Sequence, residues 1–211
     1  DDYFNFSFPR WLRIGAFVRV PLQLEVGRCL ARRPSTVRVA AEPRPSEIIL
    51  YRPMTKELTI DQAFALAERH RREGRLPQAL ALTEQLITAA PGHGDALQLM
   101  GVLSAESGNV DEGIEWLLKA LEVAPGACAY LADLGYLYCA DGQLKVAEQY
   151  CLRAIEAAPD HLPAHTNLGN VYWGLNDLNR AVTCFLSALS IDPEHVQSLN
   201  NLGATYRRQG L

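Results

Sequence analysis

The sequence lacks the short motifs that bind nucleotides or activate a nucleophile. It contains no G-x-x-x-x-G-K-[ST] phosphate loop, no G-x-G-x-x-G dinucleotide fingerprint and no G-x-S-x-G nucleophile elbow. Its carboxylates are scattered singly, and Glu112 and Glu115 fall in the first turn of an expected helix, where acidic residues complement the helix dipole. We therefore predict that this chain is not itself an enzyme and uses no cofactor.

Cysteine and histidine are too scattered for a disulfide framework or a metal site. The cysteines are odd in number and form no C-x-x-C pair, which favours a reducing, cytoplasmic compartment; they are Cys29, Cys128, Cys139, Cys151 and Cys184. His93, His161 and His195 each follow a proline by two residues. Helices normally pack roughly 10 Å apart, so these rings cannot share a zinc ion, whose bonds are about 2 Å long. No metal is expected.

No apolar run is long enough to cross a membrane. The best candidate, "WLRIGAFVRVPLQLEV", is interrupted by two Arg, a Glu and a Pro, and it is shorter than the roughly 20 residues that a span requires. The sequence therefore predicts no membrane association.

Residues 1–53 differ in composition from the rest of the chain. They carry nine Arg, no Lys and five acidic residues, a net charge of +4, whereas the remainder has 11 basic and 19 acidic residues, a net charge of −8. The Arg residues are scattered without a nucleic-acid-binding or lipid-binding motif, and the segment lacks the apolar region of a targeting peptide. We interpret residues 1–53 as an irregular Arg- and Pro-rich extension, or as sequence upstream of a true start at Met54.

The remainder of the chain is an internal repeat with a period of 34 residues. Prolines recur at this step, at positions 91, 125, 159 and 193. A column of small residues keeps the same step and comprises Ala67, Gly101, Gly135, Gly169 and Gly203. A second small column comprises Ala79, Gly113, Ala147 and Ala181. A fixed period in independent columns indicates a stack of similar supersecondary units.

Each unit contains two segments of about 14 residues with apolar residues at helical spacing, which predicts a pair of antiparallel helices roughly 20 Å long. The small columns mark where the two helices cross, because Ala or Gly lets their backbones approach closely. Cys151 and Cys184 lie at similar places in the second halves of two units, and we expect both to be small buried hydrophobes.

This unit resembles the tetratricopeptide repeat, with L-G near its start, Tyr three residues after the Gly, a small residue in mid-unit and Pro near the end. The best copies are "HLPAHTNLGNVYWGLNDLNRAVTCFLSALSIDPE" and "CAYLADLGYLYCADGQLKVAEQYCLRAIEAAPDH". The resemblance implies an all-α fold, a right-handed α-solenoid with about four full repeats and the first helix of a fifth. The repeat domain spans residues 54–211, and its repeats start at Ile60, Gly94, Cys128, Leu162 and Val196.

In such a stack the first helices line the concave face. Positions 2, 5, 6, 9, 12 and 13 of each unit lie away from the core columns, so they should face this groove. The expected peptide-binding residues are Tyr136, Asn167, Asn170, Trp173, Asn200, Asn201 and Arg207. An exposed Trp beside amides suits an extended peptide. Alternatively, Asn is an ordinary residue of the N-L-G pattern and Trp173 packs against its neighbours.

Two functional hypotheses follow. The first is a protein-protein interaction scaffold that binds a protein or peptide partner. Repeat domains that hold chaperone tails use a carboxylate clamp, but only one of five equivalent positions matches here, so that partner is disfavoured. The second is the substrate-recognition arm of a larger transferase, because Asn167 and Asn201 resemble the asparagine ladder of O-linked N-acetylglucosamine transferases. A glycosyltransferase, sulfotransferase or methyltransferase domain would then lie beyond Leu211.

The repeat that begins at Val196 has a first helix but no second one within this sequence. Leu202 and Tyr206 should therefore lack the helix that covers the equivalent residues elsewhere. We expect the chain to be a fragment, and we expect its bare end to self-associate.

Overall fold

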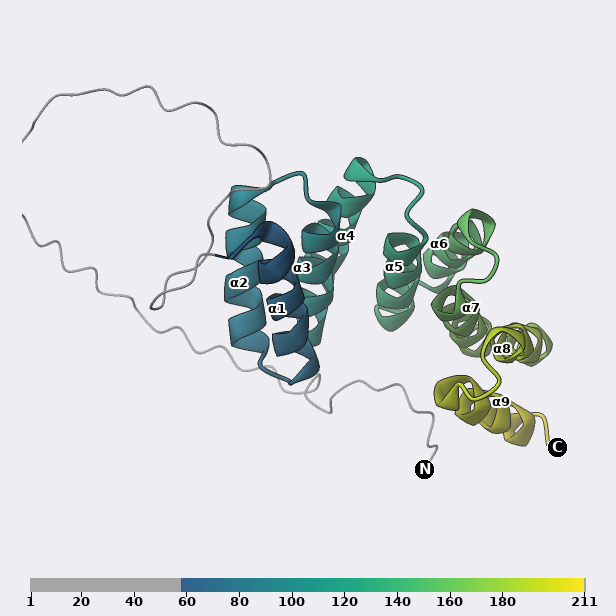
Figure 1. The fold of residues 1–211 in the computed structure, drawn as a ribbon. Coiled ribbons are helices and arrows are strands. Elements are labelled where there is room, and N and C mark those ends of the chain that lie inside the picture. The colour runs from purple at the N-terminus through teal and green to yellow at the C-terminus, as the bar shows by residue number, and fades with distance from the viewer. Residues whose placement is uncertain (1–57, 211) are drawn as a thin grey trace, which may run out of the picture.

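The computed structural model describes residues 58–210 and shows an all-α solenoid, which confirms the predicted fold class. Helix pairs follow one another along the stack in Figure 1, from α1–α2 at one end to α9 at the other. The expected extension, residues 1–53, lies outside the described residues. The helices are α1 (Ile60–Arg72), α2 (Leu76–Ala89), α3 (Gly94–Glu106), α4 (Val110–Val123), α5 (Cys128–Ala140), α6 (Leu144–Ala157), α7 (Leu162–Gly174), α8 (Leu178–Ile191) and α9 (Val196–Arg208).

The first helix of each repeat begins at the residue where the 34-residue period starts, and a left-handed residue follows two positions after each of these helices ends. The chain turns from the first helix to the second through a positive φ at Gly74, Gly108, Gly142 and Asn176, and the same conformation recurs at Gly210. A side chain with a Cβ strongly disfavours this region, whereas Gly and, less readily, Asn adopt it. The turn residue therefore fixes the length of every first helix.

Within a repeat, the two helices cross at the small columns. A Cβ added to Gly169 would lie 2.5 Å from the ring of Phe185, and one added to Gly135 would lie 2.4 Å from the sulfur of Cys151. A larger residue at either position would therefore force the Phe185 ring or the Cys151 side chain to shift. These contacts explain why a small residue recurs at the crossing.

The prediction that Cys151 and Cys184 are both buried is right for Cys151 and wrong for Cys184. Cys151 is fully buried, and burial raises the pKa of its thiol. Cys184 is only half-buried, because it lies 33 residues after Cys151 and the full step of 34 leads to the buried Phe185.

Three apolar clusters follow one another along the stack, and each joins one repeat to the next. They centre on Leu86 and Leu103, on Leu117 and Leu134, and on Val171 and Phe185. Within residues 58–210 no helix combines the length and the apolar character that a bilayer span demands.

Candidate functional site

The candidate site is the row of side chains at positions 2, 5, 6, 9, 12 and 13 of α1, α3, α5, α7 and α9, here called the inner row. Successive first helices contact one another along it, and polar bonds cross from repeat to repeat. Gln98 of α3 donates a hydrogen bond to Asp133 of α5 over 2.6 Å. Burial raises the pKa of Asp133 to about 6, although the bond from Gln98 and the nearby Arg71 act in the opposite direction.

The amides at position 6 also bond to the preceding repeat. Asn167 donates to the backbone carbonyl of Ala132 over 3.0 Å. Asn201 donates to Oδ1 of Asn170 over 2.8 Å, and both of these side chains are buried. Asn170 and Asn201 therefore lie inside the α7–α9 interface, and the structure does not place them on the open face expected from the sequence. Asn167 stays half-buried.

Two aromatic side chains of the inner row are half-buried. Tyr136 lies on α5, and burial raises the pKa of its hydroxyl, with Cys139 and Glu106 nearby. Trp173 lies on α7, and the guanidinium of Arg208 is stacked 4.4 Å from the centre of its ring. Arg208 also donates to the Trp173 carbonyl over 3.3 Å. The indole is therefore held in place while part of it stays accessible.

The other two expected site residues, Asn200 and Arg207, are exposed on α9. The structure thus places Trp173, Asn200 and Asn167 on neighbouring first helices near the C-terminal end, and it places Tyr136 one repeat earlier.

Arg208 lies at position 13 and was expected to face the groove, but of the two neighbours only Arg207 was among the expected peptide-binding residues. A signal was present, because Trp173 and Arg208 occupy positions 12 and 13 of adjacent repeats. Arg71 and Glu106 occupy the same two positions at the other end of the stack, and they form an ion pair of 3.0 Å. The register of the first helices therefore brings these two positions together wherever both side chains are long.

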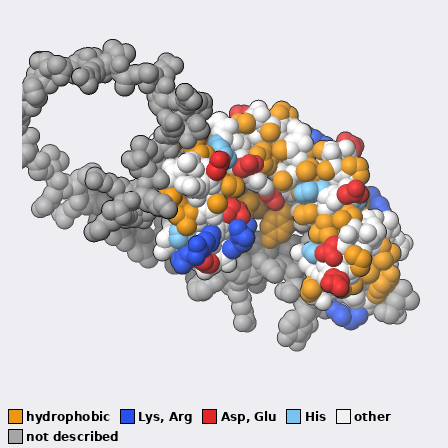
Figure 2. All heavy atoms as spheres, in the orientation of Figure 1, with side chains coloured by type: hydrophobic (Ala, Val, Ile, Leu, Met, Phe, Trp, Pro, Cys, Tyr) orange, Lys and Arg blue, Asp and Glu red, His pale blue; other side chains and the backbone are white. Residues whose placement is uncertain are grey.

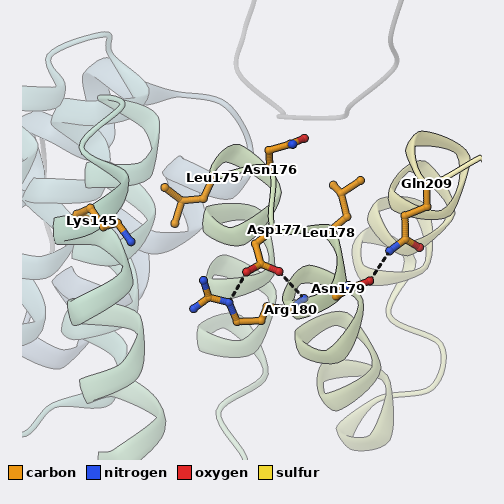
Figure 3. A pocket seen from close by; sticks show the side chains of 8 residues that line it. All are labelled: Lys145, Leu175, Asn176, Asp177, Leu178, Asn179, Arg180 and Gln209. Carbon is orange, nitrogen blue, oxygen red and sulfur yellow. Dashed lines mark hydrogen bonds and ion pairs between the residues drawn. The ribbon is translucent and has the colours of Figure 1, made fainter.

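A separate hollow of about 680 Å³ lies at the turn between α7 and α8 (Figure 3). It is lined by Lys145, Leu175, Asn176, Asp177, Leu178, Asn179, Arg180 and Gln209. Gln209, the residue directly after α9, donates a hydrogen bond to Asn179 across the edge of the hollow over 3.0 Å.

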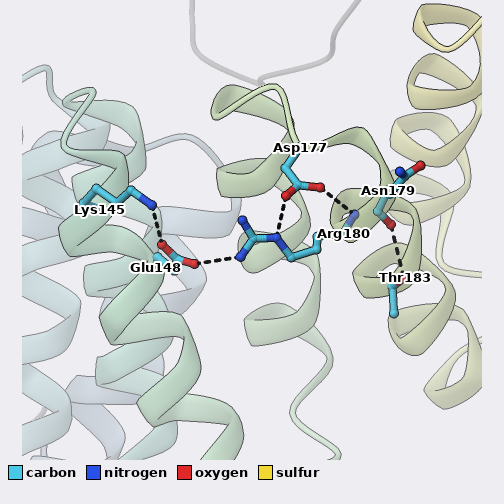
Figure 4. A network of polar contacts seen from close by, with 6 residues as sticks. All are labelled: Lys145, Glu148, Asp177, Asn179, Arg180 and Thr183. Carbon is cyan, nitrogen blue, oxygen red and sulfur yellow. Dashed lines mark hydrogen bonds and ion pairs between the residues drawn. The ribbon is translucent and has the colours of Figure 1, made fainter.

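The charged groups of this hollow already satisfy one another (Figure 4). Arg180 bonds to Asp177 over 2.6 Å and to Glu148 over 3.3 Å, and Lys145 pairs with Glu148 over 3.2 Å. The hydrogen bond that the Arg180 side chain donates to Asp177 lowers the pKa of this carboxyl group. The network ties α6 to α8 and leaves little charge for a ligand. Among the described residues, no cluster of His, Cys, Asp and Glu could hold a metal ion.

Comparison with known sequences identifies the repeat. Two family models, each described as tetratricopeptide repeat, match residues 70–134 and residues 127–194. No curated protein matches the chain.

Solved structures share the fold at low sequence identity. MamA from Desulfovibrio magneticus RS-1, residues 41 to the end, is 22% identical with a TM-score of 0.60, over 72% of this chain and 85% of that one. YrrB, described as a TPR protein with an unusual peptide-binding site, is 21% identical with a TM-score of 0.54, over 71% and 77%. The first TPR of Spaghetti (RPAP3), bound to the HSP90 peptide SRMEEVD, is 19% identical with a TM-score of 0.54, over 56% and 96%.

Proposed function

Because the chain belongs to the tetratricopeptide repeat family, we propose that it is a protein-interaction scaffold whose inner row binds an extended segment of a partner protein. The observation that carries this proposal is the half-buried Trp173, held by the guanidinium of Arg208. A pre-positioned aromatic ring offers apolar contact area and loses little conformational entropy on binding. YrrB and the RPAP3 domain, which share the fold, are described with a peptide-binding site and with a bound peptide.

The proposed site comprises Tyr136, Asn167, Trp173, Asn200 and Arg207. Trp173 is the anchor, and Tyr136 adds a second aromatic contact one repeat earlier. Asn200 is exposed, so its amide can pair with the N–H and C=O groups of a peptide. Asn170 and Asn201 support the site from within, because their buried hydrogen bond fixes α9 against α7.

The transferase-arm hypothesis ranks second. It rests on the resemblance of Asn167 and Asn201 to an asparagine ladder, and both amides donate hydrogen bonds to the preceding repeat. An amide N–H that already donates to the preceding repeat is less available to a substrate segment. The hypothesis would gain support if replacing Asn167 impaired modification of a protein substrate by the full-length protein while leaving the stack folded.

Peptide selection tests the scaffold proposal. A displayed random peptide library would be selected on residues 1–211, and the affinity of the best synthetic peptide would be measured by calorimetry. Replacing Trp173 by Ala should weaken this affinity by about 2 kcal/mol, roughly 30-fold, as expected for a central aromatic anchor.

Trp116 supplies a matched control. It lies half-buried on α4, a second helix, and Lys119 lies 4.0 Å from its ring centre. This tryptophan has the same kind of cation contact but does not belong to the inner row. Trp116→Ala should leave the affinity unchanged. Equal losses in the two variants, or no loss in Trp173→Ala, would refute the inner row as the binding surface.

A further inference from the structure

The middle of the inner row is almost free of charge. Among the inner-row positions of α5 and α7, Asp133 is the only residue with a charged side chain. It is half-buried, and two half-buried aromatic residues of the same row, Tyr136 and Trp173, lie on these two helices. Figure 2 shows basic side chains gathered around α1 and hydrophobic side chains in the middle of the stack. A single carboxylate therefore lies in an otherwise neutral and partly aromatic surface.

The Asp133 carboxylate has no ion-pair partner in the part of the chain that the structure describes. It accepts a hydrogen bond from the neutral side-chain amide of Gln98 over 2.6 Å. Arg71 acts on it electrostatically, but this guanidinium pairs with Glu106 over 3.0 Å and with Glu68 over 3.6 Å. The negative charge of Asp133 is therefore left without direct compensation.

Position 6 of the repeat does not require this charge. In the other repeats the same column holds Ala65, Leu99, Asn167 and Asn201. Asn has nearly the size of Asp, and both asparagines of the column bond to the preceding repeat without a net charge. A carboxylate shielded from water costs free energy unless a cation compensates it, and burial raises the pKa of Asp133 to about 6. An Asn would serve the stack better, and a local cost in stability is typical of a functional site.

Tyr136 lies three residues after Asp133, so the ring and the carboxylate lie on the same face of α5. A Lys or Arg side chain can pair with a carboxylate and lie against an aromatic ring at the same time. Trp173 lies on the next first helix, six positions further along the repeat. With a rise of about 1.5 Å per residue and helices roughly 10 Å apart, Asp133 and Trp173 are separated by roughly 13 Å, the length of about four extended residues.

On the premise that the inner row binds a partner segment, as proposed above, we propose that this segment carries a Lys or Arg that pairs with Asp133. The cation lies against the Tyr136 ring, about four residues along the segment from the side chain that contacts Trp173. It supplies the charge compensation that the free stack lacks. The partner is therefore a protein segment with a basic residue at a fixed distance from an apolar one.

Parallel peptide selection tests this preference. A displayed random peptide library would be selected on residues 1–211 and, separately, on the same chain with Asp133→Asn. We expect the wild-type pool to carry Lys or Arg at one fixed position, about four residues from an apolar residue, and we expect this preference to disappear on the variant. Equal frequencies of Lys and Arg at that position in the two pools would overturn the proposal.

Calorimetry then measures the charge pair directly. The probes are the best wild-type peptide and the same peptide with its Lys or Arg replaced by Gln. Asp133→Asn should weaken binding of the basic peptide by about tenfold or more and should leave binding of the Gln peptide unchanged. The variant keeps the side-chain size and an oxygen that accepts from Gln98, so it should fold, and circular dichroism checks this.

Asp141 provides the matched control. It also accepts a hydrogen bond from a Gln side chain, that of Gln143 over 2.7 Å, but it is exposed and lies directly after α5, outside the inner row. Asp141→Asn makes the same change in net charge and should alter neither affinity. Equal losses in Asp133→Asn and Asp141→Asn would show that the peptide responds to net charge, and this result would overturn the assignment to Asp133.

Trp173→Ala separates failure of this charge pair from failure of the proposed function. If the selected peptides lost affinity in Trp173→Ala but bound Asp133→Asn as tightly as the wild type, the inner row would remain the binding surface and the basic residue would be wrong. If no selected peptide depended on Trp173, the proposed function would fail, and the pairing with Asp133 would fail with it.

Discussion

Gly169 and Gly203 occupy the same repeat position in two regions of the stack, and their surroundings are opposite. Gly169 lies on α7, where the Phe185 ring of α8 leaves no room for a Cβ. Gly203 lies on α9, where a Cβ would meet nothing within 4 Å. A small residue in this repeat column is therefore a steric requirement only where a side chain of the second helix packs against it. The same sequence signal marks a contact with a second helix at Gly169, and at Gly203 no residue of the described range 58–210 makes that contact.

The strongest test of this difference is a bulky substitution at both glycines. Gly169→Leu should destabilise the stack by about 1 to 3 kcal/mol or more, because the new side chain overlaps the ring of Phe185. Gly203→Leu should not destabilise the stack, because the better helix propensity of Leu meets no steric penalty at this position. Urea unfolding midpoints, measured at low protein concentration, compare the two. Similar losses at both positions would show that the surroundings of α9 differ from those described.

A second comparison concerns the adjacent amides of α9. Asn201→Leu removes the donor that bonds Asn170 over 2.8 Å and leaves a buried amide oxygen without this hydrogen bond. The expected loss is about 1 to 3 kcal/mol in the free energy of unfolding. Asn200→Leu is the control, because this neighbour is exposed and should cost less than about 0.5 kcal/mol. If both variants unfolded at the wild-type midpoint, the buried amide pair would contribute nothing to the α7–α9 contact.

These two asparagines also mark how far the sequence could predict the structure. Helix positions and crossings follow from the period, because Pro, Gly and small residues have backbone or steric reasons to recur. The orientation of an inner-row side chain depends on its neighbour as well. Asn200 and Asn201 are the same residue type at adjacent inner-row positions. Contact with α7 nevertheless buries Asn201, whereas Asn200 stays exposed to solvent. Trp173 was identified from the sequence, but its stacking with Arg208 needed the register of two adjacent repeats.

A third prediction uses the pKa of Asp133, which burial raises to about 6 from an ordinary value of 3.8. The folded state then binds more protons than the unfolded state between these values, so this residue makes stability fall as the pH rises from about 4 through 6. Asp133→Asn keeps the side-chain size and removes the charge, and it should stabilise the stack by about 1 kcal/mol at pH 7. Unfolding midpoints of both proteins at pH 4 and pH 7 provide the measurement. An equal difference at the two pH values would contradict this assignment.

The smallest expected effect returns to Gly203. Gly within a helix costs roughly 0.5 to 1 kcal/mol relative to Ala, because the unfolded chain loses more conformational freedom on folding. At Gly203 no steric penalty offsets this gain, so Gly203→Ala should raise the free energy of unfolding by that amount at a concentration where the protein is monomeric. Gly169→Ala should lower it, since even a single methyl group would lie 2.5 Å from Phe185. The two substitutions are chemically identical, so opposite signs in denaturant unfolding would isolate the second helix as the cause. The same sign at both positions would mean that α8 yields to a methyl group, and that the crossing tolerates more than its geometry indicates.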